Sequence, residues 1–266
     1  GDHWAGSATH SYTRPSDDKR GDTQQIGTTF SGPLGERVGL RVGANSLRRE
    51  SDRSNGGVEG NAYAGEKDRN VDALLKWDVS ERQALSFEAG HGVQQAFASP
   101  ALEAEGEGAW GASELKRSNL ALNHDGQWTF GTSRLSAYWT GYRNDIGPNG
   151  RSEATDRIIE GSLGTPFTLG VEHQLSVGGQ WKRQELTNTD TIGRAPVDYD
   201  GNAVSGSTLQ VDTWAVFVED ELKLHSTVAL TLGARLDHHE QFGSHVSPRA
   251  YLVWHPNCSW RSEEHT

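Results

Sequence analysis

The sequence predicts an all-β fold, namely part of a transmembrane antiparallel β-barrel whose strands run up and down in chain order. Two long runs, 211–224 and 228–242, alternate apolar and polar residues with only His225, Ser226 and Thr227 between them. This alternation predicts a hairpin with one face in an apolar medium and the other in water. Globular strands usually have about 5 to 6 residues, whereas a tilted membrane-crossing strand needs about 9 to 11. The hairpin therefore favours a membrane barrel.

Composition excludes a helical membrane protein. The chain has 266 residues, of which 33% are hydrophobic, and no window approaches the roughly 18 consecutive apolar residues of a spanning helix. The absence of such a window does not exclude a barrel, because alternate residues of each strand face a wet lumen, which halves the apparent hydrophobicity of the strand. The nine Trp residues fit either the aromatic layers at membrane surfaces or an ordinary core.

Charge and cysteine content exclude other classes of protein. A net charge of −11 argues against a general nucleic-acid binder, which would carry a basic face. It does not argue against an anionic ligand, because local arginine placement decides that. The single cysteine, Cys258, excludes a disulfide framework and a multi-cysteine metal site.

The alternating runs predict about twelve strands in chain order. Each is a stretch in which apolar residues recur at every second position. The expected strands are 4–13, 23–31, 38–49, 70–79, 83–95, 117–128, 134–143, 157–164, 173–186, 211–224, 228–241 and 247–254.

Short and long connections alternate between these strands. The short turns are 32–37, 80–82, 129–133, 166–172 and 225–227. The long polar connections are 50–69, 96–116, 144–156 and 187–210. Outer-membrane barrels have short periplasmic turns and longer extracellular loops, so the pattern also predicts orientation. The outer ends then include Tyr142, Arg143, Trp181, Arg183, His238 and His239.

Residue parity assigns each strand two faces, because successive side chains on a strand point in opposite directions. Asp220 departs from the pattern by falling in register with apolar residues, so we expect it in a bulge or near the periplasmic rim, since a mid-membrane charge costs a few kcal/mol, on the order of 2 to 4. The expected convex lipid face includes Val71, Ala73, Leu75, Trp77, Leu85, Phe87, Leu135, Ala137, Trp139, Leu175, Val177, Trp181, Leu230 and Leu232. The expected concave lumen face includes Ser136, Tyr138, Thr140, Tyr142, Gln180, Thr231 and Arg235.

The triplet Asp237, His238 and His239 has two interpretations. The same triplet binds metal in a phosphoesterase family, but that family has an α/β fold with further Asp motifs. On a strand only Asp237 and His239 converge, and no third or fourth ligand has suitable spacing. Polar residues at the upper rim are therefore the favoured interpretation. No nucleophile–base triad, phosphate loop or zinc motif appears, and no enzyme is expected.

An acidic run in the second long connection also has two interpretations. Glu103, Glu105 and Glu107 alternate with other residues and suit a cation site or a solvated loop. Charge runs in loops are usually solvated, so the loop is favoured.

Four segments carry a family resemblance: 30–35, 216–221, 230–239 and 247–249. As an ordered set they resemble the barrel of TonB-dependent siderophore receptors, most nearly the receptors for ferric enterobactin and related catecholates. The likeness extends to about residue 256. It implies about twelve of the 22 strands of a plugged outer-membrane transporter. Residues 1–256 would be a partial barrel that lacks the plug, the TonB-contacting segment and the last strands, leaving two unpaired edges.

The last ten residues are expected to be non-native. Residues 261–266 resemble the translation of a common sequencing adapter, and we assign 257–266 to this tail.

The resemblance also implies a ligand that is anionic and aromatic, which guanidinium groups and stacking rings suit. On the lumen face we expect Arg235 and Arg249, together with Tyr138, Tyr142 and Tyr251. Beside an outer loop, Arg143 and Arg151 are candidates for first ligand capture. The alternative is that lumen arginines pair with carboxylates of the plug or wall, which the rarity of unpaired internal charges favours.

The function implied by the resemblance is energy-coupled uptake of a ferric siderophore across the outer membrane of a Gram-negative bacterium. No cofactor or resident metal is expected, because iron enters only within the ligand. The expected partners are the siderophore, TonB through the missing plug segment, and outer-membrane lipid, with colicins or phage at the outer loops. Two other classes stay open: a passive porin or adhesin barrel, and a soluble all-β carbohydrate-binding domain.

Overall fold

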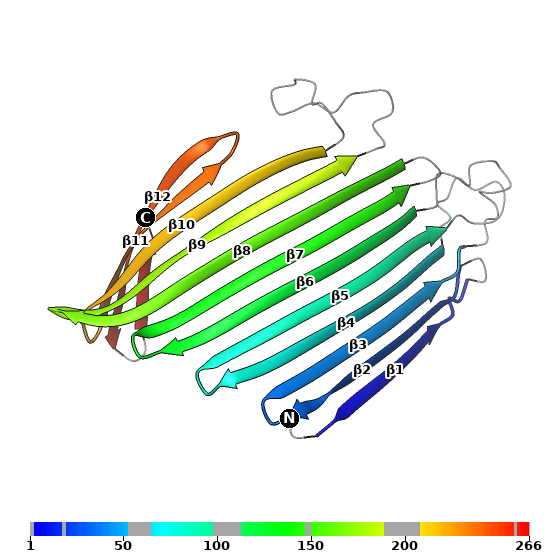
Figure 1. Cartoon of the computed structure of the whole chain (residues 1–266), viewed down its shortest axis with the longest axis horizontal. Helices are drawn as coiled ribbons and strands as arrows, with labels where there is room; N and C mark the ends of the chain where they lie inside the picture. Colours follow the sequence, from blue (N-terminus) through cyan, green and yellow to red (C-terminus); the bar gives the residue numbers. More distant parts are fainter. Residues whose placement is uncertain are drawn as a thin grey trace.

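A single antiparallel sheet makes up the described structure, a computed structural model that describes residues 3–17, 20–52, 65–97, 113–146, 150–188, 208–257 and 260–265. Within these ranges, 13 strands lie in chain order and each pairs with its sequence neighbours (Figure 1). The strands are β1 (Ala5–Thr13), β2 (Thr23–Gly35), β3 (Val38–Arg49), β4 (Gly65–Ser80), β5 (Gln83–Phe97), β6 (Ser113–Trp128), β7 (Gly131–Ile146), β8 (Gly150–Leu169), β9 (Val171–Asn188), β10 (Thr208–His225), β11 (Val228–His239), β12 (Gly243–Asn257) and β13 (Trp260–His265).

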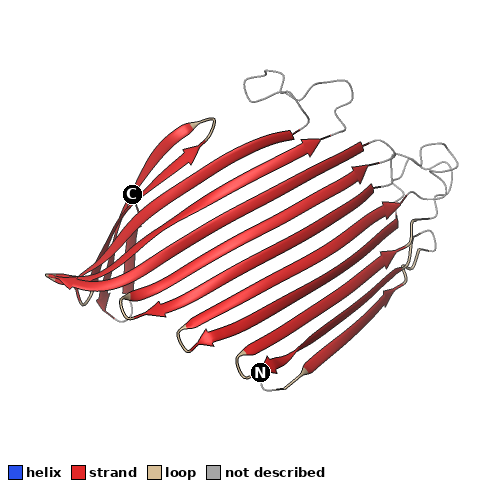
Figure 2. Ribbon diagram, viewed as in Figure 1, coloured by secondary structure: helices blue, strands red, loops and turns tan. Residues whose placement is uncertain are grey.

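The predicted meander is confirmed. Figure 2 shows strand throughout the described ranges, joined by short connections and without a second layer. The sheet is a curved open wall, and its C-terminal strands turn away from the plane of the middle strands (Figure 1). Among the described residues, no helix has the length and apolar character needed to cross a membrane.

The strands extend further at their upper ends than the sequence pattern predicts. β8, for example, runs over 20 residues, from Gly150 to Leu169, although only 157–164 was expected. Its upper part is rich in charged residues, which resemble a loop in the sequence, but the ladder continues there through pairs such as Arg143 with Glu153. A thirteenth strand, β13, falls within the expected tail and pairs with β12. That the tail is non-native stays a prediction.

The expected turns 32–37 and 166–172 are shorter than predicted, because the strands before them continue through Pro33 and Pro166. β8 runs through Pro166 to Leu169, and only Gly170, with φ of 76°, separates it from β9. Pairing of β8 with β7 ends at Gly164, so Pro166 has a neighbouring strand on one side alone. Pro33 is similar, because β1 pairs with β2 only as far as Ser31. Proline lacks an N–H group, and at such an edge its absence breaks no ladder bond.

The two faces of the sheet differ as parity predicts. Cross-strand partners share a face, so Phe87, Leu122, Ala137, Ile159, Trp181 and Trp214 form one row on what we call the outer face. On the opposite, inner face, Ser86, Asn123, Ser136, Glu160, Gln180 and Ala215 form the matching row.

Exposure confirms that the apolar face is the outer one. Leu135 is 53% exposed and its neighbour Ser136 is 2% exposed, and Leu232 and Thr231 differ in the same way, at 46% and 2%. Among the described residues, only Ala215 and Val253 are buried hydrophobic side chains, and both lie on the inner face. A soluble protein has the reverse arrangement, so the outer face needs an apolar solvent such as lipid.

An apolar belt crosses the outer face. We define it by the outward-facing residues of Val71 to Val79 on β4, Val171 to Trp181 on β9 and Trp214 to Leu224 on β10. These stretches have about 9 to 11 residues each, the length that a tilted strand needs to cross a bilayer. Trp139, Trp181 and Trp214 lie at its upper edge, where indole rings suit the headgroup layer.

Asp220 does not lie in a bulge, so that alternative is wrong. It pairs regularly with Leu175 and Leu232, five residues before β10 ends at His225. Its Oδ2 is 2.7 Å from Nδ1 of His173, whose ring stacks on Phe167 at 4.6 Å between centroids. This partner offsets part of the cost of a charge on the lipid face, although Oδ1 of Asp220 is buried and has no hydrogen-bond partner in the described residues.

Single-cysteine labelling in the full-length protein tests the assignment of faces. With any native cysteine replaced by Ser, cysteine at Leu230 or Leu232 should react with a lipid-phase probe, because both side chains point outward. Cysteine at Thr231 or Arg235 should react only with a water-soluble reagent. Reaction of the Arg235 position with the lipid-phase probe, and not of the Leu232 position, would reverse the two faces.

Candidate functional site

Arg235 and Arg249 lie on the inner face of adjacent strands, as predicted. Arg249 is the cross-strand partner of Gly233, two residues from Arg235. Nε of Arg235 is 2.9 Å from Oδ1 of Asp237, and Nη1 of Arg249 is 3.1 Å from Oε2 of Glu219. Both guanidinium groups are therefore paired with carboxylates of the barrel wall. This is the pairing that the alternative interpretation expects, and a role in ligand binding stays a prediction for both arginines.

The three expected tyrosines also lie on the inner face. The guanidinium of Arg249 sits over the Tyr251 ring, 4.8 Å from its centroid. The Tyr138 hydroxyl donates to Oε1 of Glu160 at 3.4 Å. Tyr142 is higher on the same strand and is 38% exposed.

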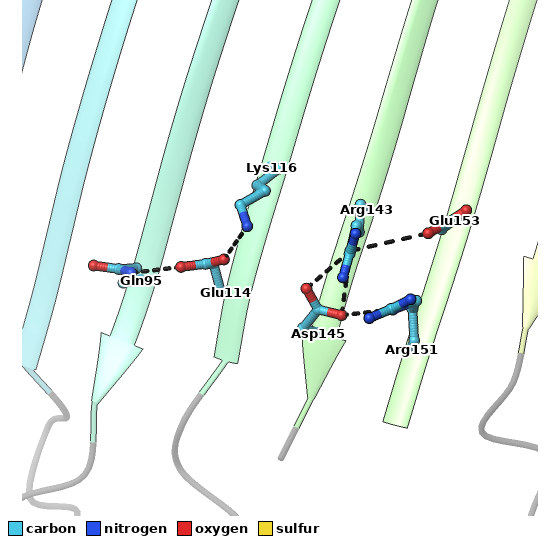
Figure 3. A network of polar contacts seen from close by, with 7 residues as sticks. All are labelled: Gln95, Glu114, Lys116, Arg143, Asp145, Arg151 and Glu153. Carbon is cyan, nitrogen blue, oxygen red and sulfur yellow. Dashed lines mark hydrogen bonds and ion pairs between the residues drawn. The ribbon is translucent and has the colours of Figure 1, made fainter. Parts of the chain in front are cut away.

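Arg143 and Arg151 lie on the outer face instead. Arg143 follows Leu135 and Trp139 in parity, and Arg151 pairs across the strands with Asp145. Nε of Arg143 is 3.0 Å from Oδ2 of Asp145, and Nε of Arg151 is 2.9 Å from its Oδ1 (Figure 3). Neither side chain shares the inner wall with Arg235 and Arg249. A role in ligand capture stays a prediction for them, restricted to the outer rim.

The carboxylate of Asp145 is held in its charged form by these neighbours. Asp145 lies above the apolar belt, outside the part of β7 that crosses the membrane. Hydrogen bonds from Arg151 and then from Arg143 lower its pKa below the ordinary value. This outward network is a compensated ion cluster rather than a group of free cations.

Sequence reasoning missed several cations on the inner face, including Arg117 and Lys182. Arg117 is the cross-strand partner of Tyr142, and Lys182 is next to the outward-facing Trp181 and so points inward. Within the described part of the chain, neither has a carboxylate oxygen within 4.0 Å. The sequence pattern could have placed Arg117 on the inner face. Leu120 and Leu122 of the same strand are even-numbered and face outward, so the odd-numbered Arg117 faces inward. Arg117 and Lys182, near the top of the inner face, therefore lack the carboxylate partners that Arg235 and Arg249 have. Arg41 and Lys76, lower on the inner face of β3 and β4, have none within 4.0 Å in the described residues either.

A pocket lies on the inner face below Arg117 and Lys182. It has a volume of about 220 Å³ and is lined by Arg134, Glu160, Gln180, Phe217 and Arg235, among others. Nε2 of Gln180 donates to Oε2 of Glu160 at 2.8 Å. The pocket offers one aromatic ring, both signs of charge and an amide, so it suits a polar aromatic group better than a plain hydrocarbon.

The triplet at the top of β11 is divided between the two faces. His238 stacks on Trp214 on the outer face, with 5.2 Å between ring centroids. His239 accepts a hydrogen bond at Nδ1 from the N–H of Gln241 at 3.1 Å. In the ranges that the structure describes, no group of three His, Cys, Asp or Glu side chains is placed to hold a metal ion. Glu103, Glu105, Glu107 and Cys258 lie outside the described residues.

Comparison with protein families gives one match over nearly the whole chain. A family model described as "TonB dependent receptor-like, beta-barrel" matches residues 2–262.

Curated relatives share this similarity. The chain is 27% identical over 263 residues to the iron-regulated outer membrane virulence protein of Vibrio cholerae, covering 97% of this chain and 37% of the relative. It is 28% identical over 288 residues to the ferric enterobactin receptor PirA of Pseudomonas aeruginosa, covering 93% of this chain and 38% of the relative. The chain thus spans well under half the length of these relatives.

Solved structures support the same fold. The siderophore receptor PirA of Pseudomonas aeruginosa superposes with a TM-score of 0.76 at 26% identity, over 99% of this chain and 42% of that one. The siderophore receptor PirA of Acinetobacter baumannii superposes with a TM-score of 0.80 at 22% identity, over 99% and 42%.

Proposed function

Because this chain belongs to the TonB-dependent receptor family, as part of its β-barrel, we propose that the intact protein takes up a ferric siderophore of the catecholate class by an energy-coupled mechanism. The barrel is an outer-membrane structure, and its curated relatives include receptors named for ferric enterobactin. The chain covers 38% of such a relative, so transport by the whole protein requires segments outside this chain. TonB contact is proposed through such a segment.

The observation that carries the catecholate proposal is the sequence of cations down the inner wall. Arg117 and Lys182 have no carboxylate partner in the described residues, and Arg117 lies opposite Tyr142. A ferric catecholate is both anionic and aromatic, so a free guanidinium beside a phenol ring suits it. In the lumen of a closed barrel, low-dielectric walls would make such charges attract an anion more strongly than in bulk water.

Arg235 and Arg249 suit passage of the ligand through the lumen better than its initial capture. Asp237 and Glu219 already neutralise Arg235 and Arg249, so an anion gains less there than at Arg117. The Tyr251 ring still offers a stacking surface beside Arg249. We propose that the ligand is captured above and is held less tightly as it descends.

Two other classes are less well supported. A soluble carbohydrate-binding domain is inconsistent with an apolar belt on the outer face. A passive porin or adhesin would not explain the family match over residues 2–262. Covalent chemistry is not proposed, since the relatives are named as receptors. Binding of colicins or phage at the outer loops stays a prediction.

Replacing the free inner cations tests this function. In the intact receptor, Arg117→Gln with Lys182→Gln should lower affinity for a ferric catecholate by roughly tenfold or more, because each removes a charged contact with the ligand. Arg235→Gln with Arg249→Gln should have a smaller effect, since both are already paired. The measurement is equilibrium binding, together with uptake of radiolabelled iron at equal surface abundance.

A comparison variant removes the same number of charges from the outer face. Arg143→Gln with Arg151→Gln should change affinity by less than about twofold. If this variant weakens binding as much as the Arg117 and Lys182 variant does, the capture site lies on the outer rim. If neither pair changes binding, the proposed ligand class loses its structural support.

Removing a carboxylate partner should have the opposite effect. Glu219→Gln leaves Arg249 without its counter-charge, so affinity for an anionic ligand should rise severalfold at low salt, and the gain should shrink as ionic strength increases. Adding Arg249→Gln should return affinity to near the wild-type value. Weaker binding by Glu219→Gln alone would show that Glu219 itself contacts the ligand.

A further inference from the structure

Three cations gather on the outer face of β3 and β4, immediately above the apolar belt. Arg48 and Lys67 are direct cross-strand partners, and Arg69 lies two residues further along β4, on the same face. We call these residues the cationic triad. All three side chains are exposed. In the described ranges, none of them has a carboxylate oxygen within 4.0 Å.

Like charges directly opposite one another destabilise a sheet unless something compensates them. The cross-strand neighbours of the triad are neutral: Gln24 is opposite Arg48, Gln95 is opposite Lys67, and Ser46 is opposite Arg69. This local concentration of positive charge occurs in a chain with a net charge of −11. The nearest acidic residues on this face, Asp22 and Glu50, lie one step above Gln24 and Arg48, and neither is within 4.0 Å of a triad cation. The charge of the triad is therefore available to an external anion.

Cations on other strands of the same face are paired, unlike those of the triad. On the same face of β6 to β8, Lys116 is 2.5 Å from Glu114, and Arg143 and Arg151 share Asp145 (Figure 3). There each cation has an acidic partner within the wall. The triad differs from this compensated cluster in charge balance, although both lie above the belt on the outer face.

The height of the triad corresponds to the lipid headgroup layer. Outward-facing positions on β4 run from Lys67 and Arg69 to Val71, the first residue of the belt. At about 3.3 Å per residue and a tilt near 45°, each outward-facing step rises about 5 Å. Arg69 then lies about 5 Å above the hydrocarbon, within a headgroup layer roughly 5 to 7 Å thick. Lys67 lies about 9 Å above the hydrocarbon, so its long side chain has to reach down to the headgroups. Lipid headgroups are therefore the anions nearest to these side chains.

We propose that Arg48, Lys67 and Arg69 bind the phosphate group of an anionic glycolipid in the outer leaflet. Guanidinium groups bind phosphate oxygens in a bidentate manner, and the ammonium of Lys67 adds a point charge. Gln24 and Ser46 supply neutral polar groups beside the triad. The acyl chains of the same lipid would lie along Val71 and Ala73 of the belt. This site depends on the outer-membrane location but not on the ligand taken up through the lumen.

Binding of lipid A by the intact, delipidated receptor in detergent tests the proposal. The triple variant Arg48→Gln, Lys67→Gln, Arg69→Gln should bind bisphosphorylated lipid A roughly a hundredfold more weakly than wild type, on the basis of roughly fivefold for each cation near a membrane surface. The matched control is Lys116→Gln, Arg143→Gln, Arg151→Gln, which removes three charges from the same face. It should stay within about twofold of wild type.

Further arms separate phosphate recognition from other effects. Dephosphorylated lipid A should bind wild type and the triple variant equally, and inorganic phosphate should compete only weakly, because it lacks acyl chains. If the triple variant does not fold, single variants should each lose about fivefold, and Arg48→Lys with Arg69→Lys should retain part of the affinity. Equal binding of bisphosphorylated lipid A by wild type and a folded triad variant would overturn the proposal. So would an equal loss in the matched control, because the effect would then follow net charge alone.

Discussion

The hydrogen-bonding requirement of the backbone is the constraint on which this structure depends. Hydrocarbon contains no water, so each N–H and C=O group at membrane depth must bond to a neighbouring strand. The ladders meet this requirement over long distances, as between β4 and β5, where pairing runs from Gly65 with Phe97 to Ser80 with Gln83. A meander with short lower turns follows, because it pairs every strand with its sequence neighbour. Pro33 and Pro166 are tolerated where a strand has one neighbour alone.

The second consequence is that each strand separates two solvents. Leu135 and Ser136 are adjacent in sequence, yet one faces lipid and the other is buried in the inner wall. Charges on the lipid-facing side occur above the apolar belt, or near its lower edge with a partner, as Asp220 has in His173. The structure therefore has almost no conventional hydrophobic core, since apolar side chains are stabilised by the membrane rather than by one another.

The cations of the sheet differ in whether a carboxylate of the wall neutralises them. Arg235 and Arg249 are paired on the inner wall, and Arg143 and Arg151 share Asp145 on the outer one. Arg117 and Lys182, on the inner side, and the cationic triad, on the outer side, lack such partners in the described part of the chain. The triad on β3 and β4 and the two inner cations on β6 and β9 thus lack carboxylate partners on opposite faces of one sheet.

Alternation in the sequence by itself determined the strands, their order and their faces, because period-2 burial is a local property of each strand. It also contained the outward placement of Arg143, which has the parity of Leu135. The upper ends of the strands were underestimated, since charged residues such as Glu153 look like a loop until a neighbour pairs with them. Only the tertiary structure decided which carboxylate neutralises which arginine. Glu219 and Arg249 are two strands apart, and their contact depends on register and side-chain reach, which no local pattern encodes.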